Sequence, residues 1–369
     1  MSAARCHRAL QTDDVLACVL SKIEVRDACL HGLAAVCKQW RGAWRRRARG
    51  SYRLVGKPSG TYHYCDHISV TPGGGVIIPD YDGNCFHHYS REGVHLATGY
   101  RGAVRTPIAI TLLDDHTAWV VSHDDITVTR LLLHLDHMPD AVAADFTTLV
   151  QIDFEARYDC DRVNDCALAG DALLVLGVGA RLDAAGTYGQ IFVLDSQTGD
   201  LRCRFGSTAL PGGVDELRVP FGLDAAGDYC FVADTYNQSI AIFNWREGTL
   251  VRRYGKQAGA PEMNDEMDYW EYEHPQGYID DRRGTGPCEF NEPYSVAVRD
   301  RFLYVSERGG RRIQILRLPD DLAASEPEVV QIIDSPNGDK LSGICHDGSR
   351  LWCMGPPQGS FAYLFVPLV

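Results

Sequence analysis

The sequence has no run of 18 apolar residues, although 45% of its 369 residues are hydrophobic. A transmembrane helix needs such a run, so none is expected. The first 14 residues, MSAARCHRALQTDD, contain no apolar stretch of the kind that a secretory signal requires. We therefore expect a cytoplasmic or nuclear protein, or one found in both places, with no membrane partner.

A regular cysteine framework is also missing. The 13 cysteines are odd in number and irregular in spacing, which argues against a set of disulfides. Buried free thiols in a reducing compartment are the better interpretation. Cys160 and Cys166 could form half of a zinc site, but no matching Cys/His pair follows them. No metal and no cofactor are expected.

Positive charge is scarce after residue 50. Residues 1–50 hold ten Lys and Arg against four Asp and Glu, whereas residues 51–369 hold 26 against 45. A domain this negative repels phosphate backbones, so nucleic-acid binding is not expected. The run RRRAR at 45–49 is either a nuclear localisation patch or the solvated end of the last expected helix. The change of charge near residue 50 indicates two parts with different roles.

One unit recurs along the second part. Residues 220–255 contain four short apolar stretches separated by turn residues, as in four antiparallel strands of one propeller blade. A shift of 73 residues places this unit on 293–317, and a shift of 154 places it on 67–90, both without gaps. Such repetition predicts an array or a propeller, because no single unit can bury both of its faces.

This pattern resembles the NHL-repeat β-propeller family. The residues that carry the resemblance are Pro220, Gly222, Gly227, Val232, Ala233, Asp234, Asn237, Ile240 and Phe243, preceded by 205–207. The resemblance implies a mainly β fold. We predict six blades, at 66–101, 106–153, 162–206, 219–255, 293–334, and 341–369 together with 51–56.

The sixth blade is predicted to close the ring. Residues 51–56, SYRLVG, match the outer strands that end the other units, but they stand alone. The last unit, in contrast, has a third strand and no fourth. If the two pair, the ring has no open strand edge.

The first part has helical periodicity. Thr12 can cap a helix, and Val15, Leu16, Val19, Leu20 and Ile23 fall on one of its faces. A second helix is expected from Asp27, with Leu33 inward, and a third around Trp40. Three short helices in about 40 residues bury little surface alone, so they need a partner or a neighbouring domain.

This segment resembles an F-box, the module that docks substrate receptors onto the Skp adaptor of SCF-type ubiquitin ligases. The residues that carry the resemblance are Leu10, Asp14, Val15, Leu16, Val19, Leu20, Ile23, Asp27, Leu33, Val36, Cys37, Trp40 and Arg41. The family usually has Pro where Gln11 stands, and an aliphatic residue where Ala28 stands. The resemblance implies adaptor binding through Leu10, Val15, Leu16, Val19, Leu20, Ile23, Leu33 and Trp40. The alternative is a three-helix cap on the propeller.

A long insertion, 256–292, separates the fourth and fifth units. Its core, 262–281, carries eight acidic residues, no Lys or Arg, and four aromatic residues. Loops of this length are often functional. We expect a target, with basic character, to bind at Asp268, Tyr269, Trp270, Glu271, Tyr272 and Arg308. The alternative is that the insertion folds back over the fifth blade.

Catalytic motifs are absent. No GxSxG, HExxH or phosphate-cradling glycine loop occurs. Possible metal ligands near the inner ends of predicted strands are Asp66, His67, Asp165, Asp224 and His346. They are scattered, so we predict strand-end hydrogen bonding for them. His87 and His88 are expected on an alternating strand surface.

A shared acidic position recurs in three units, occupied by Asp80, Asp234 and Glu307. These carboxylates could line the central channel. The favoured interpretation is that each is buried and holds the turn after it by accepting backbone N–H groups.

The sequence therefore predicts a three-helix F-box-like module at 8–47 followed by a six-bladed NHL-type β-propeller at 51–369. The resemblance implies a non-enzymatic substrate receptor that binds the Skp adaptor and a target protein. The alternative is a metal-dependent propeller hydrolase or lyase, or a small-molecule binder, with a helical cap. A third possibility is a scaffold without adaptor binding.

Overall fold

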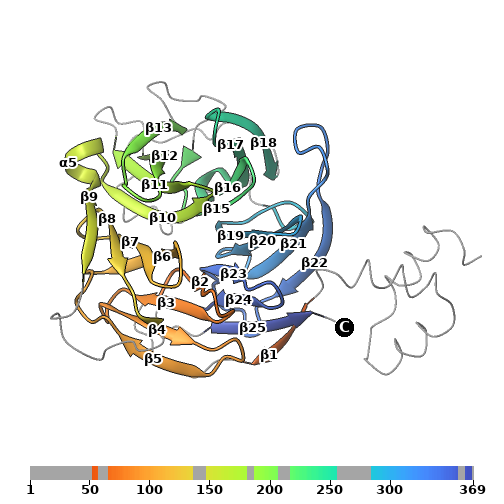
Figure 1. The fold of residues 1–369 in the computed structure, drawn as a ribbon. Helices are drawn as coiled ribbons and strands as arrows, with labels where there is room; N and C mark the ends of the chain where they lie inside the picture. Colours follow the sequence, from red (N-terminus) through yellow and green to blue (C-terminus); the bar gives the residue numbers. More distant parts are fainter. Residues whose placement is uncertain are drawn as a thin grey trace, which may run out of the picture. The chain divides into compact units, whose positions relative to one another are not determined.

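The computed structural model describes residues 52–56, 65–135, 147–180, 187–206, 217–255, 284–355 and 362–367. Leu54–Phe365 form one compact unit. The compact unit is a ring of six antiparallel sheets, here called blades one to six (Figure 1). A cavity at its centre is lined by the first strand of every blade.

Blades one to three occupy the first half of the ring. Blade one comprises β2 (Ser69–Val70), β3 (Val76–Asp80), β4 (Cys85–Tyr89) and β5 (His95–Gly99). Blade two comprises β6 (Pro107–Leu112), β7 (Thr117–Ser122), β8 (Thr127–Leu132) and β9 (Thr148–Asp153). Blade three comprises β10 (Arg162–Ala169), β11 (Ala172–Ala180), β12 (Thr187–Asp195) and β13 (Leu201–Gly206), and a fifth strand, β14 (Leu217–Arg218), pairs with β12.

Blades four to six complete the ring. Blade four comprises β15 (Gly222–Ala226), β16 (Tyr229–Asp234), β17 (Ser239–Asn244) and β18 (Thr249–Gly255). Blade five comprises β19 (Pro293–Arg299), β20 (Phe302–Glu307), β21 (Arg312–Arg317) and β22 (Glu328–Asp334). Blade six comprises β23 (Ile344–His346), β24 (Leu351–Met354), β25 (Ala362–Pro367) and β1 (Tyr52–Gly56). The six predicted blades are therefore confirmed.

The predicted closure of the ring is confirmed as well. The strand order of blade six is β1-β25-β24-β23, so its outermost strand comes from residues far upstream of the other three. A ring closed in this way leaves no blade with a missing outer strand.

The turn between the second and third strands repeats its backbone geometry. The residue just before the third strand has a left-handed conformation in blades one, four and five: φ is 47° at Asn84, 54° at Gln238 and 52° at Arg311. These three residues are related by the shifts of 154 and 73 that relate the units in the sequence. The repeat thus fixes where the third strand of each blade begins.

The hydrophobic core lies between neighbouring blades. Leu174 and Ile191 of blade three pack in one cluster with Val232 and Phe243 of blade four. Similar clusters join blades one and two, two and three, four and five, and six and one. Each blade consequently buries side chains on both of its faces, which explains the apolar character of the middle strands.

The predicted fold class needs one correction. It is mainly β, but the expected three-helix module is no part of the structure described: helix there is limited to α5 (Phe154–Tyr158) and the 3-10 turn η2 (Thr235–Asn237). Helical periodicity over about 40 residues is weak grounds for a folded module, since short helices bury little surface alone. Residues 8–47 lie outside the described ranges.

Neither α5 nor η2 has the length or the apolar character of a membrane-spanning helix, and the described residues contain no other candidate.

Candidate functional site

The central channel contains a cavity of about 300 Å³. Its polar lining includes His67, Asp165, Asp224, Arg299 and His346. Four of the five side chains that are scattered in the sequence are thus gathered at one place, because each lies on the first strand of its blade or just before it. Asp66, the fifth, is not among the lining residues.

The two channel carboxylates link neighbouring blades. Asp165 accepts hydrogen bonds from the backbone N–H of Cys166 in its own strand and of Leu223 in blade four, both at 2.8 Å. Asp224 does the same with Ala225 at 2.8 Å and with Val298 of blade five at 2.7 Å. Hydrogen bonding is therefore confirmed for both, although they lie within β10 and β15 and not at strand ends as predicted. Each carboxylate oxygen thus accepts one backbone N–H and keeps a second lone pair.

Burial controls the protonation of the channel groups. It raises the pKa of Asp165 to about 8 and that of Asp224 to about 6, and backbone N–H donors oppose the rise. Burial also lowers the pKa of His67 and of His346 to about 4 in each case. Near pH 7 both imidazoles are therefore neutral, and Asp165 is largely protonated. The Nδ1 atom of His67 lies 3.4 Å from Oδ1 of Asp165, so this pair could exchange a proton with a bound polar molecule.

A second set of buried carboxylates lies at the end of the second strand of three blades. Asp80, Asp234 and Glu307 are each 0% exposed, and none lines the channel cavity. Each accepts a backbone N–H, from Gly83 at 2.9 Å, Arg218 at 2.7 Å and Asn291 at 2.9 Å respectively. The predicted buried N–H acceptors are thus confirmed. Asp80 holds the turn that follows it through this N–H, and Asp234 holds its own turn through the side chain of Asn237, which donates at 2.8 Å. The backbone N–H groups bound by Asp234 and Glu307 belong to segments that precede their blades.

These rim carboxylates, as we call Asp80, Asp234 and Glu307, are also paired with a basic side chain. Arg253 forms an ion pair with Asp234, and Nε of Arg312 donates to Glu307 at 2.8 Å. In blade one the partner is His87, whose Nε2 lies 3.1 Å from Oδ2 of Asp80. Buried charges need such partners because transfer from water is costly.

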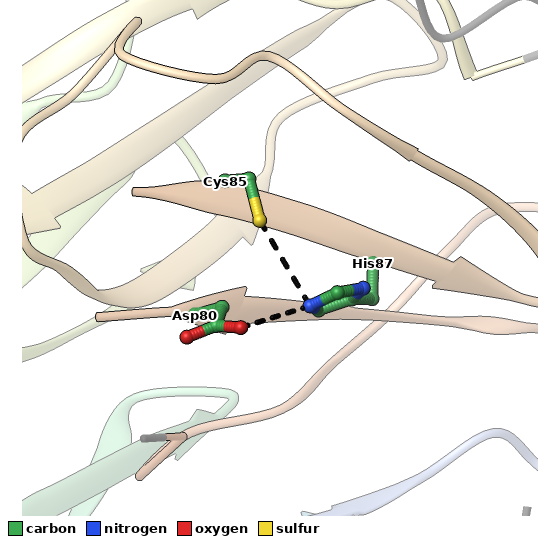
Figure 2. A group of neighbouring side chains, drawn as sticks. All are labelled: Asp80, Cys85 and His87. Carbon is green, nitrogen blue, oxygen red and sulfur yellow. Dashed lines mark hydrogen bonds and ion pairs between the residues drawn. The ribbon is translucent and has the colours of Figure 1, made fainter. Parts of the chain in front are cut away.

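His87 is the residue that the sequence interpretation placed wrongly. It is 6% exposed and points into blade one, where Asp80 and Cys85 face it (Figure 2). In the described ranges these three form the one group of His, Cys, Asp or Glu side chains whose ligand atoms all lie within 4.8 Å of one another. Alternation along a strand does not indicate exposure in a propeller, because neighbouring blades cover both faces.

The cysteines follow the prediction of free thiols. All nine cysteines in the described ranges are unpaired with one another, and seven are buried. Cys160 and Cys166 pack in the cluster between blades two and three and belong to no group of metal ligands there.

The rim near the insertion contains Arg308, the one predicted target-binding residue within the described ranges. Its guanidinium lies 5.7 Å from the ring of Tyr294, which stacks on Phe221 at 4.7 Å. Asp268, Tyr269, Trp270, Glu271 and Tyr272 lie outside these ranges, as do Leu10, Val15, Leu16, Val19, Leu20, Ile23, Leu33 and Trp40.

The last part of the insertion, 284–292, folds back onto blade five. Arg312 donates to the carbonyl oxygens of Thr285 at 2.6 Å and Glu289 at 2.9 Å, and Phe290 is fully buried. Arg312 is therefore a buried anchor for this segment. Fold-back over the fifth blade, one of the two alternatives for the insertion, holds for this segment.

Comparison with solved structures finds the same fold at low sequence identity. The luciferin-regenerating enzyme matches with a TM-score of 0.57 at 12% identity, over 86% of this chain and 95% of that one. The PQQ-bound aldose sugar dehydrogenase from Streptomyces coelicolor matches with 0.56 at 13%, over 86% and 98%. Virginiamycin B lyase from Staphylococcus aureus matches with 0.52 at 13%, over 86% and 100%. These likenesses establish the six-bladed fold. No protein-family description and no curated protein matches the sequence.

Proposed function

We propose that this chain is a non-enzymatic substrate receptor of an SCF-type ubiquitin ligase, active in the cytoplasm, the nucleus or both. Residues 8–47 bind the Skp-type adaptor, and the NHL-type propeller binds a target protein. The chain itself catalyses no reaction; it holds two partners close together.

The observation that supports the proposal is the range of residues that supplies the strands of the propeller. Each of the six blades has its four strands between Tyr52 and Pro367. The F-box-like pattern from Leu10 to Arg41 lies upstream of all these strands in the sequence, so the six blades are complete without it. Apolar segments that dock in a partner's groove are a common mode of recognition, and the F-box resemblance names the adaptor as the partner of this one.

Adaptor binding is tested by co-purification. We expect the full-length chain to retain the Skp adaptor, and the double variant Leu16→Ala/Leu20→Ala to lose it, because truncating one central apolar anchor typically costs about 2–4 kcal/mol of binding free energy. Thermal unfolding of the double variant should match that of the parent chain, since the propeller is unchanged. Adaptor retention by the correctly folded double variant would refute the proposal.

The target is proposed to be basic and to bind at the insertion. Residues 262–281 carry eight acidic side chains and no Lys or Arg, so they attract positive segments and raise their association rate at low salt. Trp270 and Tyr272 would supply apolar or cation–π contacts. Arg308 lies beside this rim and would add a polar contact.

A peptide array tests this site. The full-length chain should prefer Lys/Arg-rich over Asp/Glu-rich peptides, and replacement of 262–281 by a short Gly/Ser linker should abolish that preference. The matched control is a linker of the same kind in place of 207–216, which joins β13 to β14 and should have no effect. If the variant without 262–281 still binds basic peptides, another surface recognises them.

A second candidate, a small-molecule binder, is favoured by the channel cavity. Its volume of about 300 Å³ and its neutral His67 and His346 suit a small polar ligand. A metal-dependent hydrolase is less well supported, because Asp165 is largely protonated near pH 7 and would have to lose that proton to bind a cation. A screen for compounds that raise the melting temperature of the parent chain but not of His67→Gln separates this candidate from the first.

A further inference from the structure

The buried pocket of blade one contains three side chains that are good metal ligands. Asp80 comes from the end of β3, and Cys85 and His87 lie two residues apart on β4, so they face the same side of the strand. The Nε2 atom of His87 lies 3.1 Å from Oδ2 of Asp80 and 3.9 Å from Sγ of Cys85 (Figure 2). We propose that this pocket binds one divalent cation of zinc type.

The equivalent pockets of the other blades show what is special here. By the shifts of 154 and 73, Cys85 corresponds to Ser239 in blade four and to Arg312 in blade five. His87 corresponds to Ala241 and to Gln314. In those blades the positive charge beside the carboxylate is a guanidinium, which offers no lone pair to a metal. Blade one keeps the carboxylate and has a thiol and an imidazole at these two positions.

Two of the three separations between ligand atoms are close to those of tetrahedral zinc, and the third is within 4.8 Å. With Zn–S near 2.3 Å and Zn–N and Zn–O near 2.1 Å, a tetrahedral site separates S from N by about 3.6 Å and N from O by about 3.4 Å. The observed separations of 3.9 Å and 3.1 Å differ from these by only a few tenths of an ångström. Three protein ligands leave one coordination position for water.

The surroundings of His87 orient its ring for such a role. Its Nδ1 lies 2.8 Å from Oγ1 of Thr98, and Nε2 of His95 lies 2.9 Å from the same hydroxyl. His87 can thus donate its Nδ1–H to Thr98, while the Thr98 hydroxyl donates to His95. That arrangement leaves the lone pair of Nε2 directed toward Asp80 and Cys85. Outer hydrogen bonds of this kind are usual for metal-binding histidines.

Coordination also balances the charge of the pocket. The Cys85 thiol would release its proton to solvent on binding, and one thiolate with one carboxylate neutralises a divalent cation. A mixed thiolate, imidazole and carboxylate set suits Zn²⁺, whereas Ca²⁺ and Mg²⁺ prefer oxygen ligands only.

The test uses the tag-free full-length chain after treatment with a chelator. Titration with Co²⁺ should produce a thiolate-to-cobalt charge-transfer band that saturates at one equivalent and is removed by Zn²⁺. Cys85→Ser should abolish the band, and His87→Gln should weaken Co²⁺ binding at least ten-fold. Cys230→Ser, which changes a buried thiol in blade four, is the matched control and should leave the band intact.

Thr98→Val supplies a second readout that does not remove a ligand. It should lower the Co²⁺ affinity about ten-fold while keeping the charge-transfer band, because only the orientation of His87 is lost. If Cys85→Ser does not fold, His87→Gln and Thr98→Val decide the matter. Absence of the band in the parent chain, or unchanged binding in the variants that fold, would show that His87 merely pairs with Asp80.

Discussion

The propeller neutralises its buried carboxylates in two different ways. At the rim, Asp234 and Glu307 are held by arginines as well as by N–H donors. In the channel, Asp165 and Asp224 bond to two backbone N–H groups each and form no ion pair with Lys or Arg among the described residues. Asp234 and Glu307 are thus each paired with a fixed positive charge. The channel carboxylates are stabilised by hydrogen bonds and, for Asp165, by taking up a proton.

The largest expected effect concerns the rim. Glu307→Gln removes the charge that balances buried Arg312, and breaking a buried ion pair from one side costs about 3–5 kcal/mol. We expect a loss of this order in the free energy of unfolding, measured with denaturant. The matched control Glu328→Gln removes the partner of Arg317 at an exposed site and should cost less than 1 kcal/mol. Equal effects of the two changes would contradict an ion-paired rim.

A smaller effect is expected from crowding the same carboxylate. A Cβ at Gly310 would lie 2.2 Å from Oε2 of Glu307, so Gly310→Ala must shift the carboxylate that Asn291 N–H and Arg312 hold. Overpacking of this kind costs about 1–3 kcal/mol. The control Gly73→Ala adds a Cβ with nothing within 4 Å and should be close to neutral. If Gly310→Ala is as stable as Gly73→Ala, Glu307 and Arg312 can move to accommodate the added methyl group without loss of stability.

The smallest effect depends on pH and belongs to the channel. The pKa of Asp165 is about 8 in the folded chain and about 4 in the unfolded chain. Protonation of Asp165 therefore favours the folded chain, and the free energy of unfolding falls as the pH rises toward 8. His67 and His346, with lowered pKa values, act in the opposite sense, but only below about pH 6.5.

The parent chain should therefore lose about 1.5 kcal/mol more unfolding free energy between pH 6.5 and 8 than Asp165→Asn, which has no carboxyl group at this position to titrate. Unfolding of both chains by denaturant at these two pH values measures the difference. Glu307→Gln provides the comparison, since it should leave the change over this interval as it is in the parent chain. A parent chain and an Asp165→Asn variant with the same pH slope would show that Asp165 is ionised in the channel.

The blades could be predicted because the repeat has local markers. Turn residues such as Gly227 and the apolar stretch before Asp234 recur at fixed shifts, so blade boundaries follow from the sequence. The pairing of β1 with β25 was also predictable, because each was an incomplete part of the same unit. The helix α5 was not predicted, although Asp153 caps it by accepting the N–H of Ala156. A helix of five residues is too short to show helical periodicity in the sequence.

The sites were harder to predict because they depend on contacts between blades. Nothing local in the sequence indicates that Asp165 bonds to Leu223, 58 residues away. His87 was placed on a strand surface because alternation of side chains does not distinguish a sheet with one covered face from one with two. Asp80, Cys85 and His87 come together because β3 and β4 pair, and the sequence alone does not show that the three side chains face one another.

The pairing of β1 with β25 in blade six also affects the order of events during biosynthesis. β1 leaves the ribosome early, yet its partner β25 follows more than 300 residues later, so β1 must wait for nearly the whole chain. At about 5–20 residues per second this delay lasts on the order of 15–60 seconds, during which β1 has an unpaired edge. Contacts that close so long a loop also form late in folding. A chaperone that shields residues 52–56 during synthesis would therefore have more to protect here than at any other strand of the ring.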